Sequence, residues 1–444
     1  MGAHIRIIGG GLAGSEAAWQ ALRLGHRVTL HEMRPVKMTA AHKTDGLAEL
    51  VCSNSLKSLV EHSAPGQLKT DMTKLSSLII EAAYHARVPA GMALAVDRLA
   101  MSAFVRERLS AQPLFTLEVG EISHIPTEEE LTERNERWIV ASGPLTSDGL
   151  SESLQKLCEG SRRLHFYDAI APVIEGDSID RTIAFHASRY DKGGDEDYLN
   201  LPLNKEEYEA FVDAVIAAEK MPLHAFEETK YFEACLPIEV MIERGRETLR
   251  FGPMKPVGLT DPRTGRWPYA AVQLRKENVD GTMFSMVGFQ TKMKWPDQKR
   301  VFSMIPGLAQ AEFLRFGSVH RNTYVNSPEV LNGDLSFKRN ARVHLAGQIT
   351  GVEGYTESAA IGLLAGRFAA AKSSETTFNP PPAESVIGSL YAYITKGIKG
   401  DYAPMNANFG LLPGVERKRG QSKEEKKMLQ CQMAREAFDQ WFGN

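Results

Sequence analysis

The chain has 444 residues, of which 43% are hydrophobic and 24% charged, and its formal net charge is −3. This length suggests about three domains, or two domains of which one interrupts the other. The composition is ordinary for a soluble globular enzyme and excludes a globally basic nucleic-acid-binding protein. No run of residues approaches the ~20 apolar residues of a membrane span, and the first strand begins too early for a signal peptide. We therefore expect a cytoplasmic protein.

Residues 4–32 have the pattern strand, glycine turn, helix, strand, with Ile5, Ile7 and Ile8 as the first apolar strand. The third element of this pattern is a helix over residues 13–24, and Glu32 ends the second strand, about 20 residues after the glycines. Such a turn lets a backbone approach a pyrophosphate at the positive end of a helix, while the acid can bind an adenosine ribose. The pattern predicts a dinucleotide site whose turn is Gly9-Gly10-Gly11-Leu12-Ala13-Gly14.

The segment from Met33 to Ser58 is polar and lacks periodicity, so it is predicted to be a loop or short helical turns, and it contains Cys52. Ligands of open α/β sheets lie beyond the carboxyl ends of the strands, which places this loop near the cofactor. Further along, the sequence predicts a helix over 72–87 with Asp71 as its cap, a helix over 98–109, and strands at 137–144 and 164–167.

The middle of the chain differs in character. Asn204 and Glu207 form a capping box before an amphipathic helix, and alternating segments at 270–275 and 282–289 predict antiparallel strands. A strand at 342–347 and a small-residue helix at 356–371 then resume the α/β pattern. We therefore expect an α/β protein with a discontinuous Rossmann-like FAD-binding domain, residues 1–174 and 326–444, and an inserted α+β domain, residues 175–325. A proline-rich linker at 376–382 and a helix after the capping box of Ser422 and Glu425 follow.

The choice between FAD and NAD depends on the late glycine segment. Folds with two dinucleotide sites often end in a strand running to A-x-G-D and a helix whose N-terminus faces the flavin. Here Ala346-Gly347-Gln348 takes that place, with Gln348 where the acid would be, and Gly351 and Gly354 follow before the helix. Backbone N–H groups at such a helix start can bind flavin oxygens. FAD is therefore expected as the cofactor, with NADH or NADPH as a transient reductant.

The four cysteines are too few for a disulfide scaffold and lack C-x-x-C spacing, so no zinc or other metal site is predicted. Cys158 and Cys431 lie in helical patterns and are expected in the core. Cys235 precedes the arginines at 244, 246 and 250, and a positive neighbourhood lowers the pKa of a thiol. Residues 241–300 contain twelve Lys/Arg against six Asp/Glu, and residues 396–427 eight against four. Such segments are either solvated faces or a phosphate-binding stripe.

Five segments make the sequence recognisable: GGGLAGSEAA, ELVCSNSLKS, FEACLPIEVMIERG, LRFGPMKPVGL and GQITGVEGYTESAAIGL. Together they closely resemble the folate- and FAD-dependent tRNA (uracil-5-)-methyltransferases, and the resemblance covers essentially the whole chain. It implies C5-methylation of the T-loop uridine of tRNA, with 5,10-methylenetetrahydrofolate as the one-carbon donor. FAD carries and reduces the one-carbon unit, and NADH or NADPH regenerates the reduced flavin.

The resemblance also implies roles for individual residues. Cys235 is expected to be the nucleophile that adds to C6 of the uracil, which activates C5. Cys52 is expected to be a second functional thiol, either as a general acid/base or by holding the base or the one-carbon adduct. The target nucleotide must be flipped out of the folded tRNA, onto a basic face that contains Arg244, Arg246, Arg250 and Lys255.

Three other functions remain open. The wobble-uridine-modifying flavoproteins share the fold but are longer, with a C-terminal helical domain that this chain has no length to hold. A small-molecule flavin oxidoreductase would need no RNA, and a non-catalytic RNA-binding flavoprotein would need neither cysteine motif. The sequence does not fix the oligomeric state.

Overall fold

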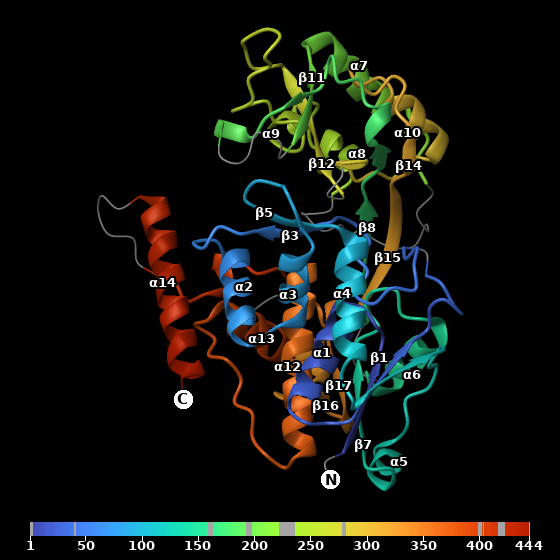
Figure 1. Cartoon of the computed structure of the whole chain (residues 1–444), viewed down its shortest axis with the longest axis vertical. Helices are drawn as coiled ribbons and strands as arrows, with labels where there is room; N and C mark the ends of the chain where they lie inside the picture. Colours follow the sequence, from blue (N-terminus) through green and yellow to red (C-terminus); the bar gives the residue numbers. More distant parts are fainter. Residues whose placement is uncertain are drawn as a thin grey trace.

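A computed structural model describes residues 3–39, 41–158, 163–191, 198–221, 236–277, 281–397, 402, 404–415 and 422–443. Figure 1 shows two units, one at each end of the long axis, connected by the antiparallel strands β8 and β15. The N-terminus, the C-terminal helix and the first 150 residues all belong to the lower unit, and residues of the middle of the chain form the upper one. The middle of the chain is thus inserted between two halves of the lower unit.

The lower unit is built on a sheet that, in the described part of the chain, has six strands in the order β16-β17-β7-β1-β2-β6. Neighbouring strands from β17 to β6 are parallel, and β16 pairs antiparallel with β17. Successive side chains of β1 point to opposite faces of the sheet. Ile5 and Ile7 are fully buried on one face, whereas Arg6 is part-buried on the other and pairs with Glu136. The bounds of these strands are β1 His4–Ile8, β2 Val28–Glu32, β6 Phe115–Val119, β7 Glu136–Val140, β16 Ser336–Phe337 and β17 Asn340–Leu345.

Helices cover both faces of this sheet. The apolar face carries a core that includes α1, α12 and the layer of α2, α3, α4, α13 and α14. On the opposite face, Ile8 packs with residues of α5 and α6. The helix bounds are α1 Leu12–Arg23, α2 Ala64–Lys74, α3 Leu78–His85, α4 Arg98–Ser110, α5 Glu128–Glu133, α6 Asp148–Leu157, α12 Tyr355–Ser373, α13 Val386–Lys396 and α14 Lys423–Phe442.

Helices α1 and α12 make the central contact of the lower unit, although more than 300 residues separate them. Both helices carry small residues where they meet, so their backbones approach closely. The predicted return of the chain to the first unit therefore has a clear structural basis. The predicted strand and helix of this late segment agree with β17 and α12 within two residues at each end.

The predicted helix over 72–87 is wrong as a single element. Helix α2 ends at Lys74 and α3 begins at Leu78, because Ser76 adopts a left-handed conformation and the Ser77 side chain accepts a hydrogen bond from the N–H of Ile80. Asp71, predicted as the cap, instead lies inside α2 and is fully buried. A local serine cap thus interrupts the apolar periodicity.

The upper unit has its own hydrophobic core, formed by residues between Ile174 and Ala311. In the described residues its sheet has the order β10-β11-β12-β13-β9-β14. The antiparallel strands predicted at 270–275 and 282–289 are confirmed as β12 and a shorter β13, which pair with each other, and the capping box of Asn204 and Glu207 is confirmed too. The strands are β9 Val173–Glu175, β10 Phe185–His186, β11 Leu199–Leu203, β12 Ala270–Lys276, β13 Met283–Met286 and β14 Phe313–Arg315, and the helices α7 Lys205–Ala217, α8 Ile238–Glu243, α9 Thr248–Phe251 and α10 Trp295–Phe302.

The remaining elements join these units. The two connecting strands are β8 Arg163–Ile170 and β15 Ser318–Val325, after which α11 Ser327–Val330 leads back to the lower sheet. A small sheet of β3 Ser55–Ser58, β5 Ala93–Val96 and β4 Arg87–Val88 lies on top of the helical layer, facing the upper unit (Figure 1). Within the described residues, no helix is long and apolar enough to cross a membrane.

Candidate dinucleotide and thiol site

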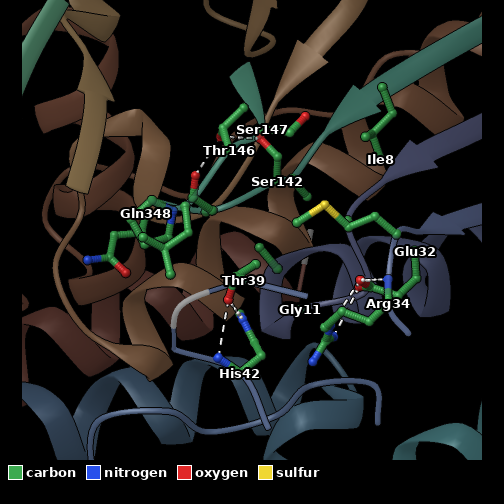
Figure 2. A pocket seen from close by; sticks show the side chains of 18 of the residues that line it. Ile8, Gly11, Glu32, Arg34, Thr39, His42, Ser142, Thr146, Ser147 and Gln348 are labelled. Carbon is green, nitrogen blue, oxygen red and sulfur yellow. Dashed lines mark hydrogen bonds and ion pairs between the residues drawn. The ribbon is translucent and has the colours of Figure 1, made fainter. Parts of the chain in front are cut away.

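A cavity opens beyond the carboxyl ends of β1, β2, β7 and β17. This is the edge of the parallel sheet at which ligands of open α/β folds bind. Residues from both halves of the lower unit contribute to it, including Gly9, Gly11, Leu12, Ala13, Glu32, Gly347 and Gln348. Figure 2 shows Gly11 and Glu32 on one side of the cavity and Gln348 on another. Seven of the eleven residues predicted to bind the cofactor thus line one cavity.

The glycine turn has the conformation that the motif predicts. Gly9 has φ +104°, and a Cβ atom on it would lie 2.5 Å from the carbonyl oxygen of Ala141. Gly14 packs under the turn, where a Cβ would lie 1.9 Å from the Gly9 oxygen. At Gly11, by contrast, no described atom lies within 4 Å of the Cβ position. The first and third glycines therefore allow close packing, while the backbone of Gly11 faces open space.

Helix α1 starts at this open position. Gly11 is its N-cap, and among the described residues no side chain caps the helix and no acid lies in its first turn. The N–H groups at a helix start need acceptors, and the helix dipole favours an anion there. Gly11, Leu12 and Ala13 all line the cavity. This uncapped helix start fits a pyrophosphate.

Glu32 is buried and bound more fully than the sequence indicates. Its Oε2 accepts the N–H of Gly10 at 2.8 Å and Nη2 of Arg34 at 3.1 Å, and its Oε1 accepts the N–H and Nε of Arg34 at 3.0 and 2.9 Å. Burial works to raise the pKa of Glu32, but the bonds from Arg34 outweigh it and hold the pKa below its usual value. Glu32 thus stays ionised, and a ribose hydroxyl would have to compete with Arg34 for its oxygens.

The sequence does not predict a role for Arg34, although this residue lies only two positions after Glu32. It is 2% exposed, and its Nη1 binds Glu49 at 2.8 Å, so one guanidinium bridges two carboxylates. Glu49 lines the cavity, and so does Arg34, which Figure 2 shows beside Glu32. A polar rim completes the wall at the end of β7 and in the loop after β2; its members are Thr39, His42, Ser142, Thr146 and Ser147. In the sequence, the feature that indicates part of this rim is the predicted strand at 137–144, which ends in a glycine turn.

The late glycine segment contributes in two ways. Gly347, with φ +83°, lies where a Cβ would be 2.6 Å from the Cβ of Ala13, so it holds the second half of the site against the first. The cavity wall includes Gly347, Gln348 and Tyr355, and Tyr355 is the first residue of α12. Gly10, Gly14, Gly351 and Gly354 lie outside the cavity wall. Gly351 instead packs against the ring of Tyr402, and Gly354 against Lys57 and Glu357.

Cys52 lies at the edge of this cavity. Its neighbour Val51 lines the wall, and its Sγ is 2.8 Å from the Oη of Tyr355, which also lines the wall. The loop of Cys52 is fixed from both units, because Asn54 donates to the carbonyl of Val96 at 3.1 Å and to that of Lys276 at 2.8 Å. The structure thus brings Cys52 to the predicted cofactor site.

The second predicted thiol, Cys235, lies outside the described residues. The chain is described again from Leu236, which is buried, and Pro237 is the N-cap of α8. Of the other cysteines, Cys158 and Cys431 are buried, as the sequence predicts. Among the described residues, no group of three His, Cys, Asp or Glu side chains could hold a metal ion.

The predicted RNA-binding residues lie in the turn between α8 and α9, on α9 and in the segment that follows, in the upper unit. Arg244, Arg246 and Lys255 are exposed, and Arg250 is half-buried. Acids neutralise part of this charge: Arg246 pairs with Asp213 at 2.8 Å and Arg250 with Glu247 at 2.5 Å. The local positive charge is therefore smaller than the sequence count indicates.

Comparisons with known proteins agree with this geometry. Residues 4–377 match the family model of glucose inhibited division protein A. The methylenetetrahydrofolate--tRNA-(uracil-5-)-methyltransferase TrmFO of Geobacter sulfurreducens is 52% identical over 438 residues, which are 98% of each chain. The same enzyme of Zymomonas mobilis is 53% identical over 440 residues, 98% of this chain and 96% of the relative.

A solved structure, that of Aquifex aeolicus GidA, superposes with a TM-score of 0.69 over 99% of this chain and 74% of its own, at 15% identity. This likeness shows the fold alone. The full-length sequence identity goes further, and the chain belongs to the glucose inhibited division protein A family and, within it, to the methylenetetrahydrofolate--tRNA-(uracil-5-)-methyltransferases.

Proposed function

We propose that the chain methylates C5 of the T-loop uridine in tRNA, with methylenetetrahydrofolate as the one-carbon donor and FAD as the cofactor. The observation that carries the proposal is the full-length identity of about half to enzymes of this name, together with a dinucleotide cavity that has a thiol at its edge. NADH or NADPH is the proposed reductant, and the cytoplasm the proposed location.

The cavity wall suits FAD. The open helix start at Gly11–Ala13 would take the pyrophosphate, and Glu32 with Arg34 would lie on the adenosine side. Gly347, Gln348 and Tyr355 would then border the flavin ring. When bound there, FAD supplies the carrier for the one-carbon unit and the reducing equivalents that turn methylene into methyl.

The protein must itself activate the uracil. C5 of uracil is a poor nucleophile until a nucleophile such as a thiolate adds to C6, so covalent activation is a chemical requirement. We assign this addition to Cys235 and a second role to Cys52, which takes or returns a proton, or holds the base or the one-carbon adduct. The contact of Cys52 with Tyr355 at the cavity supports an acid/base role, because a sulfur beside a hydroxyl group is placed to take up or return a proton.

We further propose that the upper unit binds the tRNA through the face that contains Arg244, Arg246, Arg250 and Lys255. Phe251 follows Arg250 in α9, and Trp267 comes two residues before Tyr269, which contacts Arg250; the two side chains are 82% and 55% exposed. Segment 248–254 runs along segment 269–271, since Arg250 Nε donates to the Tyr269 carbonyl and Ala271 N–H to that of Met254. Cations next to exposed aromatic rings suit an unstacked RNA loop.

A methylation assay tests the function. Purified protein, unmodified tRNA, labelled methylenetetrahydrofolate and NADPH are combined, and each is omitted in turn. We expect label in the T-loop uridine only when tRNA and the folate are both present. Cys235→Ala should abolish incorporation but keep the flavin, whereas Cys158→Ala, a buried cysteine away from the cavity, should retain both. Folate consumption without tRNA would favour a small-molecule oxidoreductase, and label in a wobble uridine would favour the other tRNA enzyme.

A further inference from the structure

Two arginines hold the peptide that precedes Cys52. Arg98, the first residue of α4, donates from Nη1 to the carbonyl oxygens of Leu50 at 2.8 Å and Val51 at 3.3 Å. Arg315, the last residue of β14 in the upper unit, donates from Nη1 to the same Val51 oxygen at 2.9 Å. The carbonyl next to Cys52 therefore accepts from two guanidinium groups of two different units. A contact of this kind fixes both the position of the loop and the charge around it.

The cluster has an excess of positive charge. A third arginine, Arg275, is 8% exposed and donates from Nε to Asn54 of the same loop at 2.7 Å. The three arginines share one buried carboxylate, that of Glu277, whose Oε2 lies 2.6 Å from Nε of Arg98. Within the described part of the chain, Nη2 of Arg98 and Nε and Nη2 of Arg315 are buried without a hydrogen-bond partner. Burying a charge without a counter-ion costs free energy, so a second anion beside the arginines would stabilise the cluster.

Among the described residues, few acidic groups face the cluster. At Arg98, burial works to lower the pKa, but Glu277, then Tyr355 and Cys52, raise it above its usual value. The pKa of Arg315 is lowered by burial and by Arg98, against Glu277, Tyr355 and Cys52. At Arg275, burial again lowers the pKa, and Glu277, Tyr198 and Cys52 oppose it. Of the groups that the structure describes, Glu277 and Cys52 are the two that raise the pKa of all three arginines.

A count of hydrogen bonds shows which atom donates between Cys52 and Tyr355. The Oη of Tyr355 accepts the N–H of Cys52 at 2.7 Å and that of Ser53 at 3.1 Å, which uses both of its lone pairs. Burial, followed by the nearby Cys52, raises the pKa of Tyr355 well above its usual value, so the phenol keeps its proton. That proton is left to point at Sγ, 2.8 Å away. The sulfur is therefore the acceptor.

We propose that Arg98 and Arg315 are positioning residues that hold Cys52 as a thiolate, hydrogen-bonded by Tyr355, and that Glu277 orients Arg98. The role of this thiolate in catalysis rests on the proposed function. The thiolate itself is inferred from the buried arginines and from the contact with Tyr355, without reference to the reaction.

The test follows ionisation of Cys52 in the flavin-loaded full chain. Iodoacetamide labelling is measured against pH, and the Cys52 peptide is quantified by mass spectrometry. In the wild type, half-maximal reactivity should fall at least one pH unit below the ~8.5 of a free cysteine. Arg98→Gln and Arg315→Gln should each raise this midpoint by about one unit, a tenfold loss of reactivity near neutral pH, whereas Arg98→Lys and Arg315→Lys should stay near the wild type.

Several controls keep the test decisive. Arg106→Gln removes an exposed arginine of the same helix, which pairs with Asp45, and should leave the midpoint unchanged. Arg315→Gln leaves the Arg98–Glu277 ion pair in place, so a raised midpoint in this variant reports the lost positive charge and not the loss of that pair. The buried Cys158 and Cys431 peptides report unfolding in the same digest. If iodoacetamide reaches Cys52 poorly, ionisation is followed instead by the ultraviolet absorbance of the thiolate. The absorbance of the Cys52→Ser variant is subtracted at each pH.

A wild-type midpoint near that of free cysteine would overturn the inference, as would unchanged midpoints in both glutamine variants. Failure of the proposed function would look different. The wild type would then show the low midpoint and its dependence on Arg98 and Arg315, yet incorporate no label into tRNA.

Discussion

Gly362 packs so closely against Ala13 that a Cβ atom on Gly362 would lie 2.2 Å from the Ala13 carbonyl oxygen. Gly366 stands in the same relation to Ala17, at 2.5 Å. These contacts join α12 to α1, and therefore the last part of the chain to the first. The start of each helix borders the cavity, so the two glycines set the spacing between the two halves of the cofactor site.

We therefore expect Gly362→Ala to separate these helices. The added methyl group meets backbone atoms that cannot rotate away, and overpacking of this kind costs about 1–3 kcal/mol. The variant should unfold at lower denaturant concentration and retain less flavin, measured as the ratio of flavin to protein absorbance. Gly414→Ala is the matched control, because among the described atoms none lies within 4 Å of its Cβ position. Equal flavin content in the two variants would contradict this role.

A second prediction concerns the ion pair of Glu32 and Arg34. Removing one member of a buried pair leaves the other charge unpaired, at a cost of about 3–5 kcal/mol. Arg34→Met should thus lower both stability and flavin content, since Glu32 and Glu49 lose their shared partner. Glu121→Gln is the control: this residue also lines the cavity, but its ion pair with Lys37 is partly exposed. Normal flavin binding by Arg34→Met would remove the pair from the cofactor site.

Much of the fold was predictable because its signals are local. The G-x-G-x-x-G turn and the capping boxes at Asn204–Glu207 and Ser422–Glu425 each depend on residues a few positions apart, and the structure confirms all three. The break at Ser76 escaped prediction, because a left-handed serine leaves the apolar periodicity intact. The domain boundaries at 174 and 325 stay a prediction, supported by the separate cores on either side.

The site was only half predictable. Its glycines and Cys52 stand in recognisable motifs, but Arg98, Arg315 and Glu277 come from three distant segments and meet only in the folded chain. Tyr355 lay within a recognised segment, yet nothing local to it indicates a contact with a cysteine 303 positions earlier. Long-range polar contacts depend on topology, which residue spacing does not encode.

A third prediction concerns pH. Burial raises the pKa of Asp71 to about 7, although its carboxylate accepts hydrogen bonds from Gln67 at 2.9 Å and the Ile387 N–H at 3.3 Å. The folded state therefore holds a proton that the unfolded state releases near pH 4, so this contribution is complete below about pH 4 and is lost as the pH rises through about 7. The loss is on the order of 3–4 kcal/mol.

Asp71→Asn should abolish that loss. The free energy of unfolding of Asp71→Asn, measured in urea, should exceed that of the wild type by an amount that grows from about pH 5 to about pH 8. The control Asp45→Asn changes an exposed residue that pairs with Arg106, and it should follow the wild-type curve. If Asp71→Asn and the wild type show the same pH dependence, Asp71 is not the titrating group.

The last prediction tests the proposed RNA face. Exposed aromatic rings offer surfaces on which unstacked bases can stack, and each such base contributes about 1–3 kcal/mol. Phe251→Ala and Trp267→Ala should therefore weaken tRNA binding by about 5- to 150-fold each, with little effect on the salt dependence. Lys255→Ala should instead lower the slope of log Kd against log salt by about one, because one phosphate contact is lost.

Phe442→Ala provides the matched control. Phe442 is 50% exposed at the end of α14, on the opposite unit, and stacks on Phe438 with the ring centres 6.0 Å apart. Binding of unmodified tRNA is measured by titration at several salt concentrations for all four variants and the wild type. Equal losses for Phe442→Ala and Phe251→Ala would indicate a general effect of removing surface aromatics. Unchanged affinity and unchanged slope in the upper-unit variants would instead move the RNA face to the second basic segment, residues 396–427, because that stretch has the other local excess of positive charge.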